Sequence, residues 1–160
     1  GKEVLDHILY DGALSTTNAN TELTIFDQTE AAAGLDQSNM PSDSSLPSAQ
    51  HFLVKEISTH FNDVVASADV ENILDRASFE FRLNDRRMIA GPLREFMSGA
   101  TVIPAGVTQD EQYFVGTSYK LERYIHIPGG VKFNVFIQTG ETAPGVSTEL
   151  TVCLKGLLAR

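Results

Sequence analysis

The chain has 160 residues, of which 42% are hydrophobic and 21% charged, and a formal net charge of −9. This composition is typical of one ordinary globular domain and excludes a disordered chain, and no apolar run approaches the roughly 20 residues of a transmembrane helix. The acidic balance argues against direct genome binding, because proteins that coat nucleic acid usually carry a basic stripe or arm that neutralises phosphates.

The N-terminal segment precedes the first clear strand. Residues 1–14 place apolar side chains at a helical spacing and fit either a short helix or an extended arm. We assign residues 1–20 as an N-terminal arm and residues 21–160 as the folded domain. Thr21–Phe26 combines β-branched residues with alternation and predicts the first strand of that domain.

A long loop is predicted next. Residues 27–50 are rich in Ser, Asp, Asn and Pro and show no lasting hydrophobic period. A connection of this length is uncommon inside a compact domain and tends to be functional or mobile. It ends at a strongly apolar strand predicted for His51–Phe61.

One helix is predicted in the middle of the chain, over Val64–Arg76, as a short connection between strands. Phe79–Leu83 alternates apolar and polar residues and predicts the next strand. Asn84-Asp85 then favours a tight turn into a strand over Arg86–Ala90.

The C-terminal half predicts further strands. Brief ones are expected at Ala100–Ile103 and Tyr113–Val115. Tyr119–Gln138 holds two alternating apolar runs joined by Pro128-Gly129-Gly130, a pattern that predicts a half-buried β-hairpin. Thr148–Arg160 is predicted to close the chain as a strand.

Seven to nine strands separated by turn signals predict an all-β fold, an antiparallel β-sandwich with one short connecting helix. Strands do not alternate with long helices, so an α/β fold is disfavoured.

No constellation of residues predicts catalysis. His51 and His60 are nine residues apart on one predicted strand, and this odd separation places them on opposite faces. His126 could join either of them only through folding, and its alternation points it toward solvent. A metallo-cupin enzyme would need a closer cluster such as His-x-His. We therefore predict no metal, no cofactor, no catalytic residue and no enzymatic activity.

Four acidic residues lie close together at Asp63, Asp69, Glu71 and Asp75. They could supply an acid–base pair, but on a short helix they are more simply helix caps and solvated charges.

The basic residues Arg82, Arg86, Arg87 and Arg94 form a small cluster, for which a solvated or salt-bridged face is favoured over a nucleic-acid contact. Cys153 is the only cysteine, so no internal disulfide can form, and a half-buried strand thiol is predicted for it.

A series of short motifs runs through most of Leu46–Arg160. They are Leu46-Pro47-x-x-Gln50-x-Phe52-x-Val54, Phe79-Glu80-Phe81-Arg82-Leu83, Gly91-Pro92-Leu93, Tyr119-x-Leu121, Ile127-Pro128-Gly129-Gly130-x-x-Phe133-x-Val135 and Leu150-x-Val152-x-Leu154-x-Gly156-x-Leu158. This series resembles the jelly-roll capsid proteins of small icosahedral tailless bacteriophages. The resemblance does not extend to the first 45 residues.

The resemblance implies a single jelly roll that self-assembles through rings or trimers into an icosahedral shell. The expected partners are copies of the chain and other virion proteins, with contact to an internal viral membrane as a further expectation. The expected location is the virion, assembled in the cytoplasm of a bacterial host. The alternative is a spike or receptor-binding domain of similar fold that recognises a host surface glycan.

Overall fold

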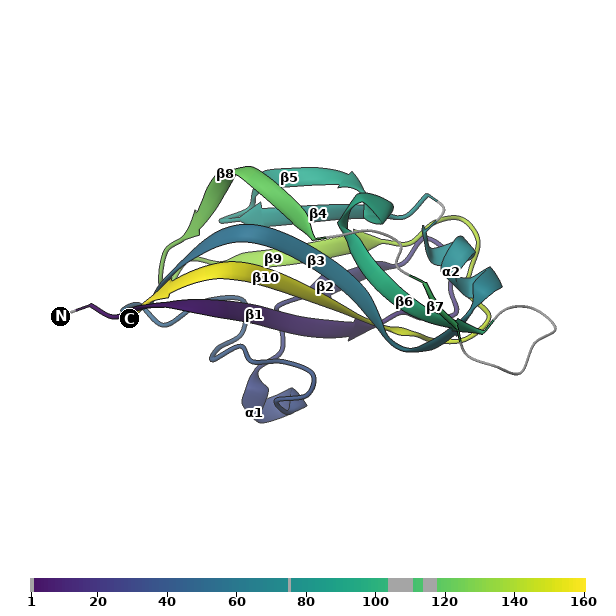
Figure 1. Cartoon of the computed structure of the whole chain (residues 1–160), viewed down its shortest axis with the longest axis horizontal. Helices are drawn as coiled ribbons and strands as arrows, with labels where there is room; N and C mark the ends of the chain where they lie inside the picture. The colour runs from purple at the N-terminus through teal and green to yellow at the C-terminus, as the bar shows by residue number, and fades with distance from the viewer. Residues whose placement is uncertain (1, 75, 104–110, 114–117) are drawn as a thin grey trace.

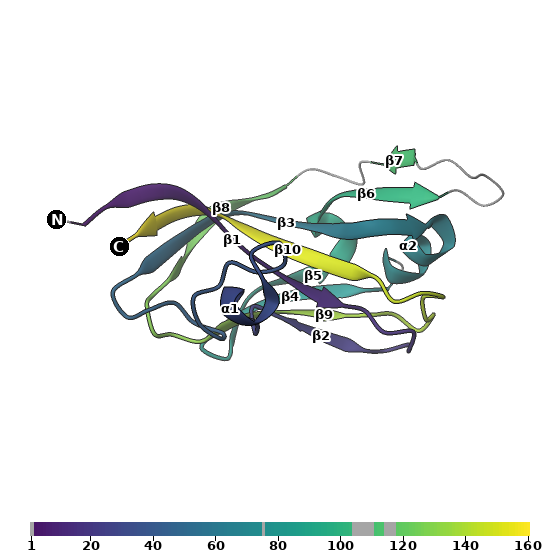
Figure 2. The same cartoon turned by 90° about the horizontal axis from the view of Figure 1, so that it is seen from below.

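Two β-sheets pack face to face in the computed structural model, which describes residues 2–74, 76–103, 111–113 and 118–160 (Figures 1 and 2). The larger sheet has six strands and the smaller sheet four. The strands are β1 (Val4–Leu14), β2 (Glu22–Ile25), β3 (His51–Ala66), β4 (Ser78–Leu83), β5 (Arg86–Pro92), β6 (Met97–Ile103), β7 (Glu111–Tyr113), β8 (Tyr119–Ile127), β9 (Phe133–Gln138) and β10 (Glu149–Ala159). The helical elements are α1 (Glu30–Ala33), α2 (Ser67–Leu74) and a 3-10 turn, η1 (Leu93–Phe96). The predicted β-sandwich is confirmed.

The pairing of the strands is nested. The larger sheet has the order β1-β10-β3-β6-β7, with β8 also paired to β3, and the smaller sheet has the order β2-β9-β4-β5. The first strand thus pairs with the last, β2 pairs with β9, β3 with β8, and β4 with β5, all antiparallel. The exception to antiparallel pairing is β3 with β6, which run parallel. Both termini lie at the same end of the sandwich, and α2 lies at the opposite end (Figure 1).

The alternation of apolar and polar residues along the strands places apolar side chains between the two sheets. Apolar side chains on the facing sides of the two sheets are buried, and each contributes about 1.5–3 kcal/mol when fully removed from water. Phenylalanine supplies the bulkiest side chains of this layer, and the ring of Phe79 stacks on that of Phe96 with centroids 4.1 Å apart. The largest buried rings are those of Phe26, Phe52, Phe79, Phe81, Phe96 and Phe133.

The turn predicted at Asn84-Asp85 is confirmed. It joins β4 to β5, and both of its residues have a left-handed backbone, with φ of 51° and 61°. Two residues of positive φ make the kind of turn whose twist matches that of the strands it connects.

The hairpin predicted over Tyr119–Gln138 is wrong. Both of its strands exist, but β8 pairs with β3 in the larger sheet, whereas β9 lies between β2 and β4 in the smaller one. The segment between them crosses from sheet to sheet. A side chain at Gly129 would meet the backbone oxygens of Ser48 and Gln50 within 2.7 Å, so the crossing segment passes tightly under the long loop. Each strand turns its apolar side inward, but from opposite layers.

The predicted N-terminal arm is instead a strand of the larger sheet. Residues Val4–Leu14 are extended rather than helical, and every one of them pairs with a residue of β10. These residues form a strand because β10 offers them a partner along their whole length. A helix of this length without a packing partner would be only marginally stable.

The remaining predicted elements differ from the structure in the residues at which they begin and end. Helix α2 begins only at Ser67, because β3 continues to Ala66, and it connects β3 to β4 as predicted. The predicted long loop contains the four-residue helix α1, which the sequence analysis did not anticipate. Strand β7 ends at Tyr113, and the predicted continuation to Val115 lies outside the described residues. No helix among the described residues is long and apolar enough to cross a membrane.

Candidate functional site

Strand β1 forms an edge of the larger sheet. Glu3 and Ser15 donate backbone hydrogen bonds toward the β10 side, to Arg160 and Thr148. Because backbone groups alternate in direction, the even-numbered residues of β1 direct their N–H and C=O groups to the free edge. Their side chains lie on the outer face, where Val4, Ile8 and Leu14 are 61%, 46% and 61% exposed. Within the described residues, backbone groups that no neighbouring strand pairs and exposed apolar side chains therefore coincide on β1.

Asn39, from the long loop, covers the middle of this edge. The Tyr10 N–H donates to Asn39 Oδ1 at 2.9 Å, and Asn39 Nδ2 donates to the Ile8 carbonyl at 2.6 Å. The backbone N–H of Asn39 also donates to the Tyr10 carbonyl at 3.2 Å. One residue thus takes the place of a neighbouring strand over Ile8–Tyr10. The described residues supply no such cover for the edge groups of Val4 and Asp6.

The long loop is held to β1 by two further contacts. The Tyr10 hydroxyl donates to the Leu35 carbonyl on the outer side. On the inner side Asp11, a fully buried carboxyl, accepts the Phe26 N–H at 2.6 Å where the loop leaves β2. Burial raises the pKa of Asp11 to about 6, although the hydrogen bond from Phe26 favours its charged form.

A groove of about 640 Å³ lies on the outer face of the larger sheet beside this edge. It forms where β10 and β3 are both irregular, since their register shifts between Lys155 and Gly156 and again between Val54 and Glu56. A Cβ at Gly156 would overlap the Leu53 carbonyl, so the close approach of these strands requires glycine. The lining residues are Asp6, His7, Ile8, Asn39, Lys55, Glu56, Lys155 and Gly156.

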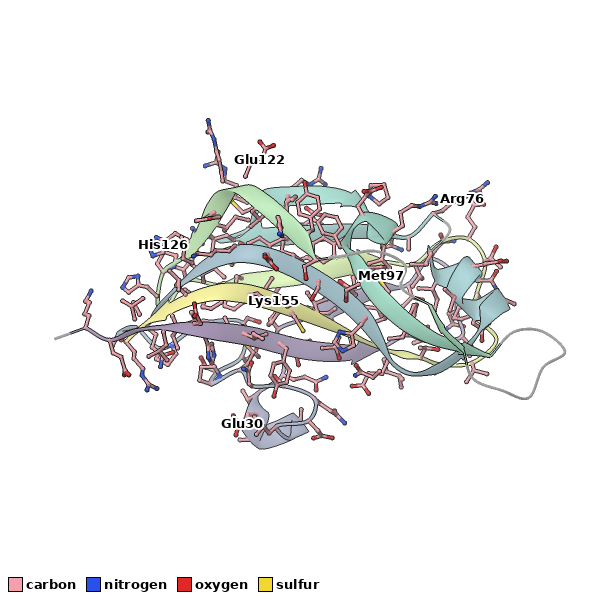
Figure 3. All side chains as sticks on the ribbon, in the orientation of Figure 1. Glu30, Arg76, Met97, Glu122, His126 and Lys155 are labelled. Carbon is pink, nitrogen blue, oxygen red and sulfur yellow. The ribbon has the colours of Figure 1, made fainter. Side chains whose placement is uncertain are left out.

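The groove carries charges of both signs. Lys155, which Figure 3 shows on the outer face of β10, donates to the Ser118 hydroxyl at 3.0 Å. The Lys55 ammonium lies 5.4 Å from the centre of the exposed Tyr124 ring. Burial, followed by the charge of Arg160, lowers the pKa of His7, which keeps this imidazole neutral near pH 7. The two lysines, with Asp6 and Glu56 of the same lining, give the groove a mixed charge that suits the binding of a polar surface.

The fold brings together two of the histidines considered in the sequence analysis. His51 Nδ1 and His126 Nε2 are 3.1 Å apart, on adjacent strands β3 and β8. The prediction that His51 and His60 lie on opposite faces is wrong, because the irregularity near Glu56 reverses the alternation of β3. Phe52 and Val54 are buried before it, and Ile57, Thr59 and Phe61 after it, so both histidines face outward. Among the described residues, no three His, Cys, Asp or Glu side chains group in a way that could hold a metal ion.

The acidic cluster is dispersed. Asp69 is buried and accepts the Gly145 N–H at 2.6 Å, so it holds the loop before β10 and is not a solvated charge. Glu71 is exposed, as predicted. Asp75 and the side chain of Asp63 lie outside the described residues.

Within the basic cluster, the predicted salt-bridged face is confirmed for two residues. Arg82 and Arg87 donate through Nε to Glu80 at 2.7 and 2.9 Å. These hydrogen bonds lower the pKa of Glu80 to about 2. Arg86 and Arg94 are exposed.

Cys153 is a half-buried thiol on β10, as predicted, and burial raises its pKa. The thiol form is therefore favoured over the reactive thiolate.

Comparison with protein-family models gives no match to this chain, and a search of curated proteins gives none either. No pattern in the sequence points to Asn39 or Asp11 as functional residues. A polar residue in a loop and a carboxyl in an apolar alternation are common, and only the folded register shows what they contact.

Proposed function

We propose that this chain is a viral structural protein, a capsid subunit that self-assembles into an icosahedral shell. The observation that carries this proposal is the long edge strand β1, which combines backbone groups of Val4 and Asp6 that no described residue covers with the exposed side chains of Val4 and Ile8. Free edges of this kind are templates for pairing with another chain. No residue is assigned a catalytic role.

The nested pairing supports a single jelly roll as the fold of the subunit. Pairs β1 with β10, β2 with β9, β3 with β8 and β4 with β5 describe one long antiparallel hairpin wrapped into two sheets. The two sheets then have the orders β1-β10-β3-β8 and β2-β9-β4-β5, with β6 and β7 as an addition to the larger one. Jelly rolls are used in viral capsids.

The partners are copies of the same chain and other virion proteins. A net charge of −9 disfavours direct contact with the genome, so the shell would enclose a genome that another protein or an internal membrane screens. On this proposal the chain assembles in the cytoplasm of a bacterial host and resides in the virion.

Sedimentation velocity of two surface variants tests the role of the edge. Ile8→Lys introduces a charge on β1, and Met88→Lys does so on β5 of the other sheet, at residues that are 46% and 42% exposed. We expect the wild type and Met88→Lys to form large species and Ile8→Lys to remain small. Equal sedimentation of all three proteins would contradict the assignment of β1 as the assembly edge.

A second candidate is a spike or receptor-binding domain that recognises a host glycan. The observation in its favour is Tyr124, whose ring is 54% exposed on β8 beside Lys55 of the groove. Exposed aromatic rings combine an apolar face with a polar edge, which suits a sugar. This function predicts a small fixed oligomer and glycan binding that is lost in Tyr124→Ala.

A further inference from the structure

We propose that His51 and His126 form a binding site for a divalent transition-metal ion such as Zn²⁺, Ni²⁺ or Cu²⁺. The two imidazoles supply two ligands on the outer face of the larger sheet, and water completes the coordination. Imidazole nitrogen suits these ions in particular. The inference is independent of the proposed function and concerns a different part of the surface from the β1 edge.

The spacing of the two nitrogens fits a shared ion. His51 Nδ1 and His126 Nε2 lie 3.1 Å apart. Two nitrogens that bind one tetrahedral zinc at 2.0–2.1 Å are about 3.3–3.4 Å apart. The distance between the two nitrogens therefore has to grow by only a few tenths of an ångström to suit a shared ion. The ring planes are 16° apart and the ring centroids are separated by 5.2 Å, so the two nitrogens face each other and both rings must turn for their lone pairs to converge on one ion.

An ion can replace the hydrogen that the two rings share. One of the two facing nitrogens carries the hydrogen of the bond between them, and the other accepts it. A neutral imidazole can hold its proton on either nitrogen, so the proton moves to the far nitrogen of the same ring. Both facing lone pairs are then available to the ion.

The two ligands are held by adjacent strands. His126 lies opposite Leu53 in the β3–β8 register, and His51 is two residues before Leu53 on β3. Figure 3 shows His126 near the end of the molecule where the termini lie. In the described part of the chain β8 joins the sheet through β3. An ion bound here would therefore link β8 to β3 and stabilise the folded state, increasingly so as the concentration of free ion rises above its dissociation constant.

The other two histidines provide matched controls. His7 packs its ring edge-on against Phe52, with centroids 6.2 Å apart, and lies on β1. His60 lies on β3 itself, toward the far end of the strand from His51, and burial followed by the charge of Lys155 lowers its pKa. Glutamine at each position removes the imidazole and retains a polar side chain of similar size.

Isothermal titration of the metal-free protein with ZnCl₂ tests the proposal. We expect one ion per chain, and a loss of affinity of roughly tenfold or more in His51→Gln and in His126→Gln, since even changes around metal ligands cost 10–100-fold. His7→Gln and His60→Gln should bind as the wild type does. Absence of saturable binding, unchanged affinity in His126→Gln, or an equal loss in His60→Gln would each overturn it.

A second measurement needs no variant and so cannot fail through misfolding. Substoichiometric Ni²⁺ should broaden the imidazole NMR signals of two histidines in the wild-type protein and leave the other two sharp. Broadening of all four signals alike, or of none, would also overturn the proposal.

Discussion

Asp11 is a fully buried carboxyl group on β1. It remains there because it accepts the Phe26 N–H at the point where the backbone turns left-handed, with φ of 70°. A backbone N–H without a partner at this buried position would cost roughly 1–3 kcal/mol. This hydrogen bond requires the Asp11 carboxyl to be buried, and burial disfavours its charged form. The nearby charge of Asp27 disfavours that form further.

The pH dependence of stability should report this group. Its pKa rises from 3.8 to about 6 on folding, so the folded state binds the proton more tightly than the unfolded state. The resulting stabilisation is complete below about pH 3.8 and is lost as the pH rises through about 6, a change of at most about 3 kcal/mol.

Asp11→Asn should remove this contribution. In urea unfolding at pH 7 and pH 4, we expect the variant to gain about 2–3 kcal/mol relative to the wild type at the higher pH. Asp6→Asn, at an exposed position of the same strand, is the control and should follow the wild type. A constant difference between Asp11→Asn and the wild type at both pH values would contradict the assignment.

Glu80 presents the opposite case. Its side chain is 17% exposed and accepts hydrogen bonds from two guanidinium groups, which lower its pKa to about 2. We expect Glu80→Gln to lower the free energy of unfolding by about 1–2 kcal/mol at pH 7. The stabilisation should disappear as the pH falls from 4.5 toward 2.

The control is Glu141→Gln. The Glu141 side chain is 71% exposed, and its ion pair with Arg76 should contribute less than about 0.5 kcal/mol.

At the scale of elements, the junction of β10 with β3 depends on one glycine. A methyl group at Gly156 would overlap the Leu53 carbonyl, so Gly156→Ala should lower the free energy of unfolding by about 1–3 kcal/mol or more. Gly91 of β5 is the matched strand glycine, because a Cβ there would sit 3.5 Å from the Phe96 ring, at ordinary contact distance. Gly91→Ala should be neutral or stabilising by up to about 1 kcal/mol. Equal destabilisation in the two variants, measured by thermal unfolding, would show that the close approach is not what selects glycine.

The cover that Asn39 gives to β1 should also be measurable. Asn39→Ala removes two side-chain hydrogen bonds to the edge strand and should cost about 1–2 kcal/mol. It should also increase irregular association, seen by light scattering, because more of the edge becomes available. Asn18→Ala, in an exposed turn, provides the comparison. If both variants scatter light equally, Asn39 does not protect the edge.

The element scale also shows how far the sequence predicts the fold. Alternation in Tyr119–Gln138 correctly predicts two strands and their apolar sides. It does not predict which strands they pair with, because an apolar side chain can be buried in the core from either sheet of a sandwich. The same limit applies to Val4–Leu14, whose extended state depends on pairing with β10, more than a hundred residues away.

The candidate sites were harder to predict than the strands. A strict two-residue period places His51 and His60 on opposite faces, and a single register shift in β3 reverses that result. The contact of His51 with His126 depends on the pairing of β3 with β8, which no local pattern encodes. Asn84-Asp85 was predictable because a tight turn is determined by its own two residues.

At the scale of the whole molecule, the nested pairing places loops at the ends of the sandwich and a single strand at each edge of a sheet. The long loop seals the middle of the β1 edge through Asn39, and Val4 and Ile8 remain exposed beside it. A subunit that assembles through this edge can therefore remain soluble alone and still offer a defined strip to a neighbour. This combination of protection and exposure is what the capsid proposal requires.

Negative-stain imaging of the purified chain over a range of concentrations is the decisive test of capsid assembly. We expect closed shells or regular arrays of subunits that grow with concentration. Uniform small particles that never enlarge, whatever the concentration, would contradict it.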